Sequence, residues 1–166
     1  MNTTKINVKW GTSVKLITTI VCAILVATVY YLITSLYLFF DWSILIALCI
    51  VPLIFLYFLL ESPKFLELNK TGIIVHRWKG KLTINYEQIS KIEPYKPDYT
   101  DIRLIGSGGV FGFIGKFSSS TIGNYQSYVG DNKQAFLIET KEGKKYVLSC
   151  GNRDLVINTI KQQIQL

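Results

Sequence analysis

The sequence lacks charged residues over two long stretches. No Lys, Arg, Asp or Glu occurs in Leu16–Phe40 or in Ser43–Leu60, and only Asp41-Trp42 separates the two. A core helix of a soluble protein would show polar residues on its outer face, and neither stretch does. At about 1.5 Å per residue the two stretches would form helices of roughly 37 and 27 Å, against a hydrocarbon core of about 30 Å. We therefore predict two membrane-spanning helices in a tight hairpin, 16–40 and 43–60. The absence of a charge inside them argues against a transport path.

Histidine and cysteine are also scarce. His76 is the only histidine, and the three cysteines, Cys22, Cys49 and Cys150, are spaced too widely for a zinc pattern or a disulfide framework. No metal and no cofactor are therefore expected. No nucleophile, base and acid assemble into a catalytic set, which disfavours an enzyme and leaves His76 as the only obvious candidate base. A histidine at the surface of a sheet is the simpler interpretation of this residue.

The basic residues are distributed unevenly. The formal net charge is +7, but the lysines form no continuous run, which argues against a nucleic-acid partner. Lys5, Lys9 and Lys15 precede the first span, whereas the connection between the spans has no basic residue. The positive-inside rule then places both termini in the cytoplasm. Residues 1–15 are predicted to be a short basic head with little structure. Trp10 and Trp42 are predicted to anchor the chain at the membrane interface.

Beyond the second span the hydrophobic pattern changes from continuous to alternating. Lys81–Tyr86 alternates apolar with polar side chains, and Ala135–Ser149 holds two such runs around a glycine-containing turn. A helix is predicted from about Arg153, with Asn152 as its N-cap and an apolar stripe that packs on the sheet. Residues 62–166 are therefore predicted to form one α+β domain, a small antiparallel barrel or sandwich of six or seven strands with a C-terminal helix.

The most unusual soluble stretch interleaves five glycines with three phenylalanines in Gly106–Phe117. It matches neither a Walker phosphate loop nor a dinucleotide fingerprint, since Val110 and Phe111 stand where those motifs need glycine. Such frequent glycines indicate positive φ angles and close backbone approach. One interpretation is that the phenylalanines close one end of the barrel. The other is an exposed aromatic tip that enters the bilayer interface or grips a partner. The candidate binding residues here are Phe111, Phe113, Phe117, Gly108, Gly109 and Gly112.

With this segment as its most specific part, the sequence resembles an uncharacterised family of bacterial pleckstrin-homology-like (PH-like) domain proteins. The resemblance rests on Gly106–Phe117, on Gly123-Asn124-Tyr125 and on Phe136–Ser149, and it covers roughly Pro63 to the C-terminus. It implies a barrel-like sandwich of seven strands capped by a C-terminal helix, often accompanied by a pair of membrane spans. A location in the bacterial inner membrane follows from the same resemblance. The family brings no established catalytic residues.

A basic cluster lies around one predicted turn: Arg77, Lys79 and Lys81. Eukaryotic PH domains that bind phosphoinositides use a basic first hairpin, and this cluster is loosely similar, so a lipid head group is one candidate ligand. A surface basic turn without a ligand is the simpler alternative.

These observations favour a membrane-anchored, non-catalytic binding or scaffolding module at the cytoplasmic face. Its expected partners are membrane lipids, through the two spans, and either an unknown protein or a lipid head group. Polar residues of the first span, Tyr30, Tyr31, Thr34 and Tyr37, are expected to pack on the second span or on another subunit, which leaves a homo-oligomer open. The alternative function is an enzyme that acts on a membrane-associated substrate.

Overall fold

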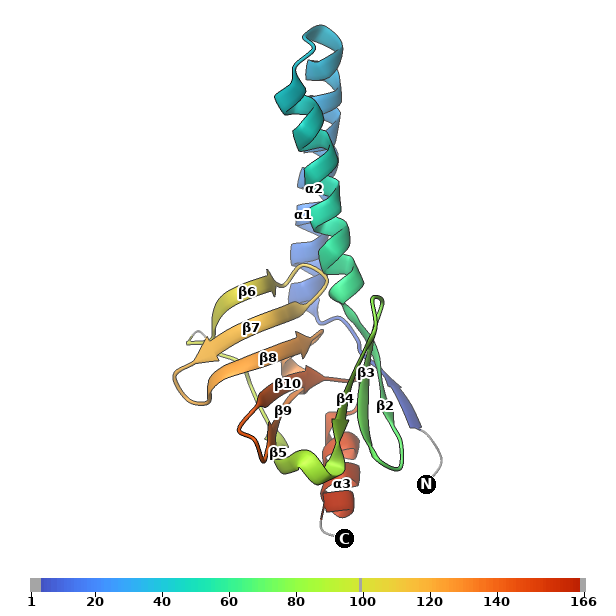
Figure 1. The fold of residues 1–166 in the computed structure, drawn as a ribbon, viewed down its shortest axis with the longest axis vertical. Coiled ribbons are helices and arrows are strands. Elements are labelled where there is room, and N and C mark those ends of the chain that lie inside the picture. Colours follow the sequence, from blue (N-terminus) through green and yellow to red (C-terminus); the bar gives the residue numbers. More distant parts are fainter. Residues whose placement is uncertain (1–3, 99, 165–166) are drawn as a thin grey trace.

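Two long helices project from a β-rich domain (Figure 1). The computed structural model describes residues 4–98 and 100–164. Helix α1 covers Thr12–Leu38 and helix α2 covers Trp42–Glu61. Both are long and apolar enough to cross a membrane. Helix α1 begins before the predicted span because its first turn still belongs to the domain, where Val14 is buried. The side chain of Asp41 accepts a hydrogen bond from the Ser43 amide and caps α2, the usual role of an N-cap carboxylate.

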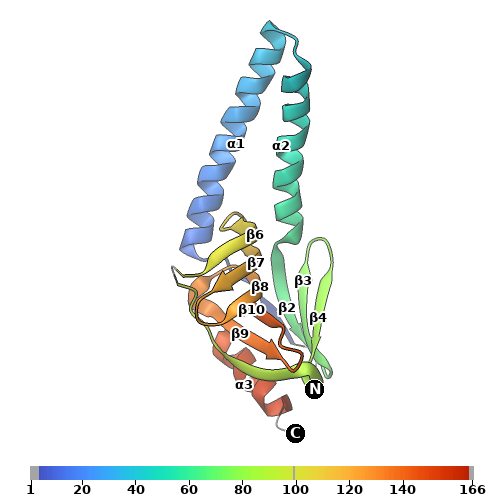
Figure 2. The ribbon, with the colours of Figure 1, turned by 60° about the vertical axis from the view of Figure 1, so that its left-hand side comes forward.

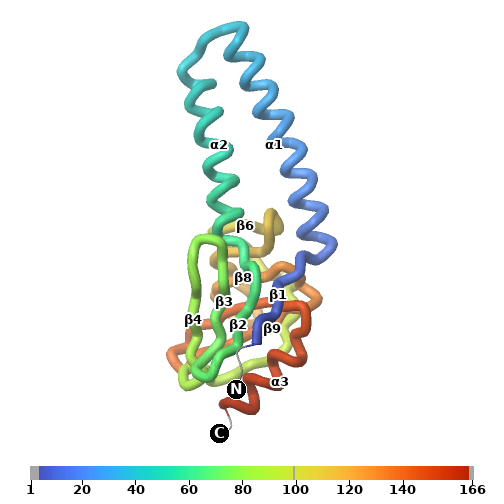
Figure 3. Tube along the Cα trace, turned by 90° about the vertical axis from the view of Figure 1, so that its right-hand side faces the viewer, coloured from blue at the N-terminus to red at the C-terminus, as the bar shows by residue number. Residues whose placement is uncertain are grey.

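The two helices are not parallel. Figures 2 and 3 show them joined at the far end and spread apart where they meet the domain. Helix α2 is continuous through Pro52.

The first sheet has four strands and includes a strand from the N-terminal head. Its order is β1-β2-β3-β4, all antiparallel. The strands are β1 (Thr4–Asn7), β2 (Pro63–Leu68), β3 (Gly72–Arg77) and β4 (Lys81–Asn85). The prediction of little structure for residues 1–15 is therefore wrong for residues 4–15, and residues 1–3 lie outside the described part of the chain. Strand β1 forms because β2 offers a free edge and because Ile6 and Val8 pack against the core.

The segment that follows β1 ties the two sheets together. The Val8 amide donates to the Lys64 carbonyl at 3.0 Å, beside β2. The Gly151 amide donates to the Asn7 carbonyl at 3.0 Å, and the Gly11 amide donates to the Gly130 carbonyl at 2.8 Å. Residues 4–11 thus form a strap, which runs from the edge of the first sheet across the end of the second sheet and into α1.

The second sheet has six strands in the order β5-β9-β10-β8-β7-β6. The strands are β5 (Ile89–Pro94), β6 (Ile102–Gly108), β7 (Phe113–Ser119), β8 (Gly123–Val129), β9 (Ala135–Thr140) and β10 (Lys145–Ser149). The expected antiparallel pairing holds except between β8 and β10, which are parallel. Strand β10 inserts between β8 and β9. Strands β8 and β10 run in the same direction and β9 runs opposite to β10, so that β10 has one parallel and one antiparallel neighbour.

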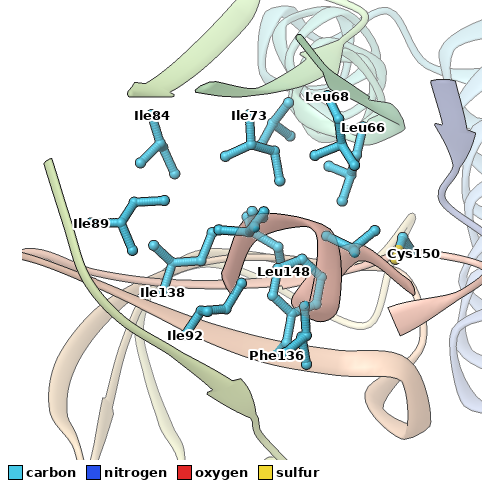
Figure 4. Packing of buried hydrophobic residues seen from close by; sticks show 14 of the residues in the cluster. Leu66, Leu68, Ile73, Ile84, Ile89, Ile92, Phe136, Ile138, Leu148 and Cys150 are labelled. Carbon is cyan, nitrogen blue, oxygen red and sulfur yellow. The ribbon is translucent and has the colours of Figure 1, made fainter. Parts of the chain in front are cut away.

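The two sheets face each other as a sandwich, with helix α3 (Arg153–Ile164) packed beside them. Between them lies the inter-sheet core, in which Leu66, Leu68 and Ile73 of the first sheet face Ile138 and Leu148 of the second (Figure 4). Helix α3 starts at the predicted residue, with the Leu155 amide donating to the Asn152 side chain, and buries Val156, Ile157 and Ile160. The predicted α+β class is confirmed.

The six-stranded sheet carries a second apolar cluster on its outer face. Successive residues of a strand point to opposite faces, so that Ile138 lies in the inter-sheet core while Leu137 lies outside it. This outer cluster consists of Phe117, Tyr125, Val129, Ala135, Leu137 and Val147, with Tyr95, Phe113 and Ile122 at its margin.

Candidate functional site between the helices and the sheets

The turn between β6 and β7 lies between the start of α1 and the end of α2, where the two helices meet the domain. On the α1 side, Thr18 accepts a hydrogen bond from the Phe111 amide at 3.0 Å and donates to the Gly109 carbonyl at 3.4 Å. On the α2 side, the Ser62 hydroxyl donates to the Phe111 carbonyl at 2.9 Å. Thr18 and Ser62 are both buried. A single turn of the sheet is therefore held by hydrogen bonds from both arms of the hairpin.

Phe111 fills the space between the helices at this point. Its ring centroid lies 4.8 Å from that of Phe55 on α2 and 5.9 Å from that of Trp10 in the strap. The residue is buried and adopts a φ of 58°, which is unusual for a bulky side chain. Gly109 also has a positive φ, and a Cβ there would lie 2.6 Å from Ile17 Cδ1. The φ of 123° favours glycine at this position, as the sequence indicated, whereas the end of the Ile17 side chain could move aside. We call this region the junction.

Phe113 and Phe117 lie elsewhere, on the outer face of the six-stranded sheet. The Phe117 ring stacks on Tyr125 at 5.7 Å and an interplanar angle of 22°. Phe113, Phe117 and Gly108 line a cavity of about 460 Å³, together with Asp101 and Tyr125. Burial, with the nearby Asp101 carboxylate, raises the pKa of Tyr125 far above its ordinary value. We call this cavity the outer pocket.

The six glycine and phenylalanine candidates therefore do not form one tip. Phe111 and Phe117 are buried, which excludes the exposed aromatic tip for these two side chains. The reason for Phe111 is that the helices cover the turn. The interpretation that these residues close one end of the domain fits Phe111 best, since it seals the end that faces the helices.

The predicted basic cluster also divides. Arg77 is engaged inside the protein. Its Nη1 lies 2.5 Å from Glu61 Oε2 at the end of α2, and its guanidinium lies 5.4 Å from the Tyr128 ring centroid on β8. Lys79 Nζ lies 3.4 Å from Glu61 Oε1 but is more than half exposed. Lys81 is exposed on β4. Arg77 thus links the hairpin to both sheets, whereas Lys79 and Lys81 face solvent.

The profile of the bacterial PH domain family matches residues 65–164, which is more than half of the chain. The chain belongs to the bacterial PH domain family. No curated protein and no solved structure matches it. The matched region begins in β2 and ends with α3, so the hairpin and β1 lie outside it. PH-like domains are in general binding modules.

The turn between β3 and β4 is the part of the PH domain beside the end of α2 (Figure 1). The Lys79 amide donates to the Leu60 carbonyl at 2.8 Å. Trp78 is 59% exposed, and Lys64 Nζ lies 3.7 Å from the centroid of its ring. Sequence reasoning missed Trp78 and Lys64, although a tryptophan in a polar, basic turn was a usable signal. An exposed indole with an ammonium group over its ring suits the head-group level of a bilayer.

The two predicted interface tryptophans differ in their surroundings. Trp42 is 68% exposed at the tip of the hairpin, where it packs edge-on against Phe40 with 5.3 Å between the ring centroids. Trp10 is partly buried against Phe111, at the level where the helices enter the PH domain. Both therefore lie at an end of the apolar helices, and their contact with a membrane remains a prediction.

His76, the candidate base, is held within the first sheet of the PH domain. Its ring stacks on Phe65 with 4.2 Å between centroids, and its Nε2 lies 2.8 Å from Glu67 Oε2. Only 12% of the side chain is exposed. No three His, Cys, Asp or Glu side chains in residues 4–98 and 100–164 gather closely enough to hold a metal ion. The geometry favours a structural role for His76.

Proposed function

We propose that this protein is a membrane-anchored, non-catalytic binding module that holds its PH domain at the cytoplasmic face of the bacterial inner membrane. The observation that carries the proposal is the junction. One turn of the PH domain is hydrogen-bonded to both helices of an apolar hairpin, so the domain and the hairpin form one packed body. A hairpin of this length and composition suits a bilayer.

Strand pairing supports the proposed topology. Strand β1 precedes α1, β2 follows α2, and the two strands pair from Thr4↔Leu68 to Asn7↔Phe65. If the helices cross a membrane, both flanks of the hairpin must then lie on the same side. Lys5, Lys9 and Lys15 in the first flank favour the cytoplasmic side.

Anchoring has a direct consequence for binding. A domain that is fixed at the membrane meets other membrane components at a high effective concentration, without any need for an active site. The β3–β4 turn, with Trp78, Lys79 and Lys81, is the proposed contact with anionic lipid head groups. The outer pocket, with Phe113 and Phe117, is the proposed contact with a protein partner, since it offers aromatic contact area beside polar groups.

Topology is tested first with reporters of cytoplasmic and external location. One reporter follows residue 166 and a second is inserted after Asp41. The proposal expects a cytoplasmic reporter at the C-terminus and an external one at the hairpin tip. An external C-terminus would overturn it.

Partner binding is tested by crosslinking in intact membranes, followed by mass spectrometry of the captured proteins. Phe113→Ser should lose at least one partner that the unchanged protein captures. Phe65→Ser is the matched control, because Phe65 is also a half-buried phenylalanine but lies on the first sheet. Identical captured proteins from both variants and from the unchanged chain would rule out the outer pocket as the partner site.

A further inference from the structure

A groove lies between the diverging helices, directly above the six-stranded sheet. It has a volume of about 360 Å³, within the size range of small-molecule sites. Its walls are apolar side chains of α1 and α2, and its floor is the β6 strand and the following turn. The helices spread apart at this level (Figures 2 and 3). The residues that matter below are Val21, Leu25, Thr28, Val51 and Phe55 of the walls and Arg103 of the floor.

Among the residues that the structure describes, Arg103 is the only charged one that lines this groove. Its guanidinium takes part in none of the ion pairs found in residues 4–98 and 100–164. The guanidinium lies close to Gly108. A Cβ atom added to this glycine would be 3.0 Å from Arg103 Nη1. Arg103 also lines the outer pocket, where Asp98 and Asp101 lie, but it forms an ion pair with neither carboxylate. Its guanidinium is therefore available to an external anion.

Strand β6 shows an apolar surface around this arginine. Strand β6 is an edge strand of the sheet, and its residues Ile102, Leu104 and Ile105 are 66%, 53% and 71% exposed. Figure 1 shows β6 as the strand of the six-stranded sheet that lies nearest to the hairpin. Exposed large aliphatic side chains on the side from which the apolar helices leave are suited to the interfacial region of a bilayer.

We infer that the groove binds an anionic phospholipid, with one acyl chain between α1 and α2 and the phosphate at Arg103. The inference rests on the proposed function, because it requires that the hairpin spans the membrane. A phospholipid matches both halves of the site, since its chain is apolar and its phosphate is anionic. Arginine binds phosphate in a bidentate, charge-assisted geometry.

The lipid also explains how the hairpin remains stable although its helices spread apart where they meet the domain. Packing voids destabilise a folded protein because the atoms that line them lose contacts. The Phe111 side chain fills the lower part of the gap between the helices, and an acyl chain would fill the part above it. The occupant is therefore expected to stabilise the junction as well as to bind there.

The head-group part of the inference is tested with the full chain in mild detergent after delipidation. Phosphatidylglycerol and phosphatidylcholine are added separately, and bound lipid is counted by native mass spectrometry. The unchanged protein should prefer phosphatidylglycerol about tenfold, because the choline cation of phosphatidylcholine lies beside the phosphate and offsets its attraction to the Arg103 guanidinium. Arg103→Gln should abolish that preference. Lys116→Gln, which removes the same charge from an exposed position on β7 outside the groove, should keep it.

The acyl-chain part is tested by filling the groove. Val51→Trp should reduce retention of both lipids, because Val51 faces the groove. Leu53→Trp places the same side chain on an exposed part of α2 and should retain both. Equal lipid preference in Arg103→Gln and the unchanged chain would overturn the inference, and so would crosslinked dimers with a second copy in the groove. If the topology reporters hold in that case, the proposed function survives and only the lipid site fails.

Discussion

The inter-sheet core and the junction both hold the protein together, but through different interactions. The core is built from aliphatic and aromatic side chains, many of them fully buried, such as Leu66, Ile138 and Phe136. The junction combines aromatic contacts of Phe111 with three hydrogen bonds and the Glu61–Arg77 ion pair. The hydrophobic effect is non-directional and roughly proportional to the apolar area that is buried, whereas hydrogen bonds and ion pairs depend on the distance and angle between specific atoms.

The difference indicates two levels of stability. The core should determine whether the PH domain folds, and the junction should determine how the folded domain is held against the helices. Variants of the core are therefore expected to change the free energy of unfolding most. Variants of the junction are expected to change local opening, with smaller effects on global unfolding.

Phe136→Ala should have the largest effect, because Phe136 is completely buried in the core. The expected loss is about 3–5 kcal/mol in the free energy of unfolding. The measurement is urea unfolding of the full chain in detergent, followed by alkylation of Cys150 in a background with Cys22→Ser and Cys49→Ser. Burial raises the pKa of the Cys150 thiol to about 11, so the folded protein should react very slowly at pH 8.

A matched control for this variant is Phe40→Ala near the hairpin tip, where Phe40 is 67% exposed. It should leave the urea midpoint for Cys150 within experimental error. A shift as large as that of Phe136→Ala would contradict the division into two levels.

Phe111→Ala should weaken the junction by about 2–3 kcal/mol, toward the lower end for a buried phenylalanine, because the neighbouring helices can close part of the cavity. Limited proteolysis of proteoliposomes should cut the β6–β7 turn faster in this variant. The urea midpoint reported by Cys150 should change less than the proteolysis rate does. Equal changes in both measurements would mean that core and junction open together.

Arg77→Gln should cost about 2 kcal/mol, since it leaves the half-buried carboxylate of Glu61 with only the exposed Lys79 as a partner. Arg77→Gln combined with Glu61→Gln should cost less than the single change, because the uncompensated charge is gone. The free energies come from the same urea experiment. A double variant that is less stable than the single one would show that the remaining pair between Glu61 and Lys79 outweighs the uncompensated charge.

Ser62→Ala should have the smallest effect, about 1 kcal/mol, because it removes one neutral hydrogen bond to the Phe111 carbonyl. Proteolysis of the β6–β7 turn is the sensitive readout. Thr34→Val serves as the comparison, because the Thr34 hydroxyl bonds only to the Tyr30 carbonyl of its own helix. The proteolysis rates of Ser62→Ala and Thr34→Val should differ by about fivefold. Identical rates would show that the Ser62 hydrogen bond does not stabilise the junction.

Local sequence patterns predicted much of the fold. The continuous apolar runs correspond to α1 and α2, and the alternating runs near the C-terminus correspond to β9 and β10. Strand β1 was missed although Ile6 and Val8 alternate with polar neighbours, because a short basic segment forms a strand only beside a partner. The parallel β8–β10 ladder has no local signal at all, since it depends on which strands become neighbours.

The candidate site was predicted less well. The period of two along a strand places Phe113 and Phe117 on the same face of β7, which could have been anticipated. Phe111 belongs to the turn, where that period no longer applies, and its position depends on helices far away in the sequence. Thr18, Ser62 and Arg103 carry no motif. Their roles depend on tertiary neighbours, which a single sequence does not reveal.

Strand β1 has a consequence for the order of events during synthesis. It is synthesised before α1 and α2, yet its partner β2 is made only after both helices. The first sheet therefore cannot be completed until the chain has turned back through α2. A hairpin already inserted in the membrane would bring Asn7 and Phe65 close together and reduce the entropy that closing this loop costs. Pairing of β1 would then act as a checkpoint, at which only chains with a correctly inserted hairpin acquire a finished domain.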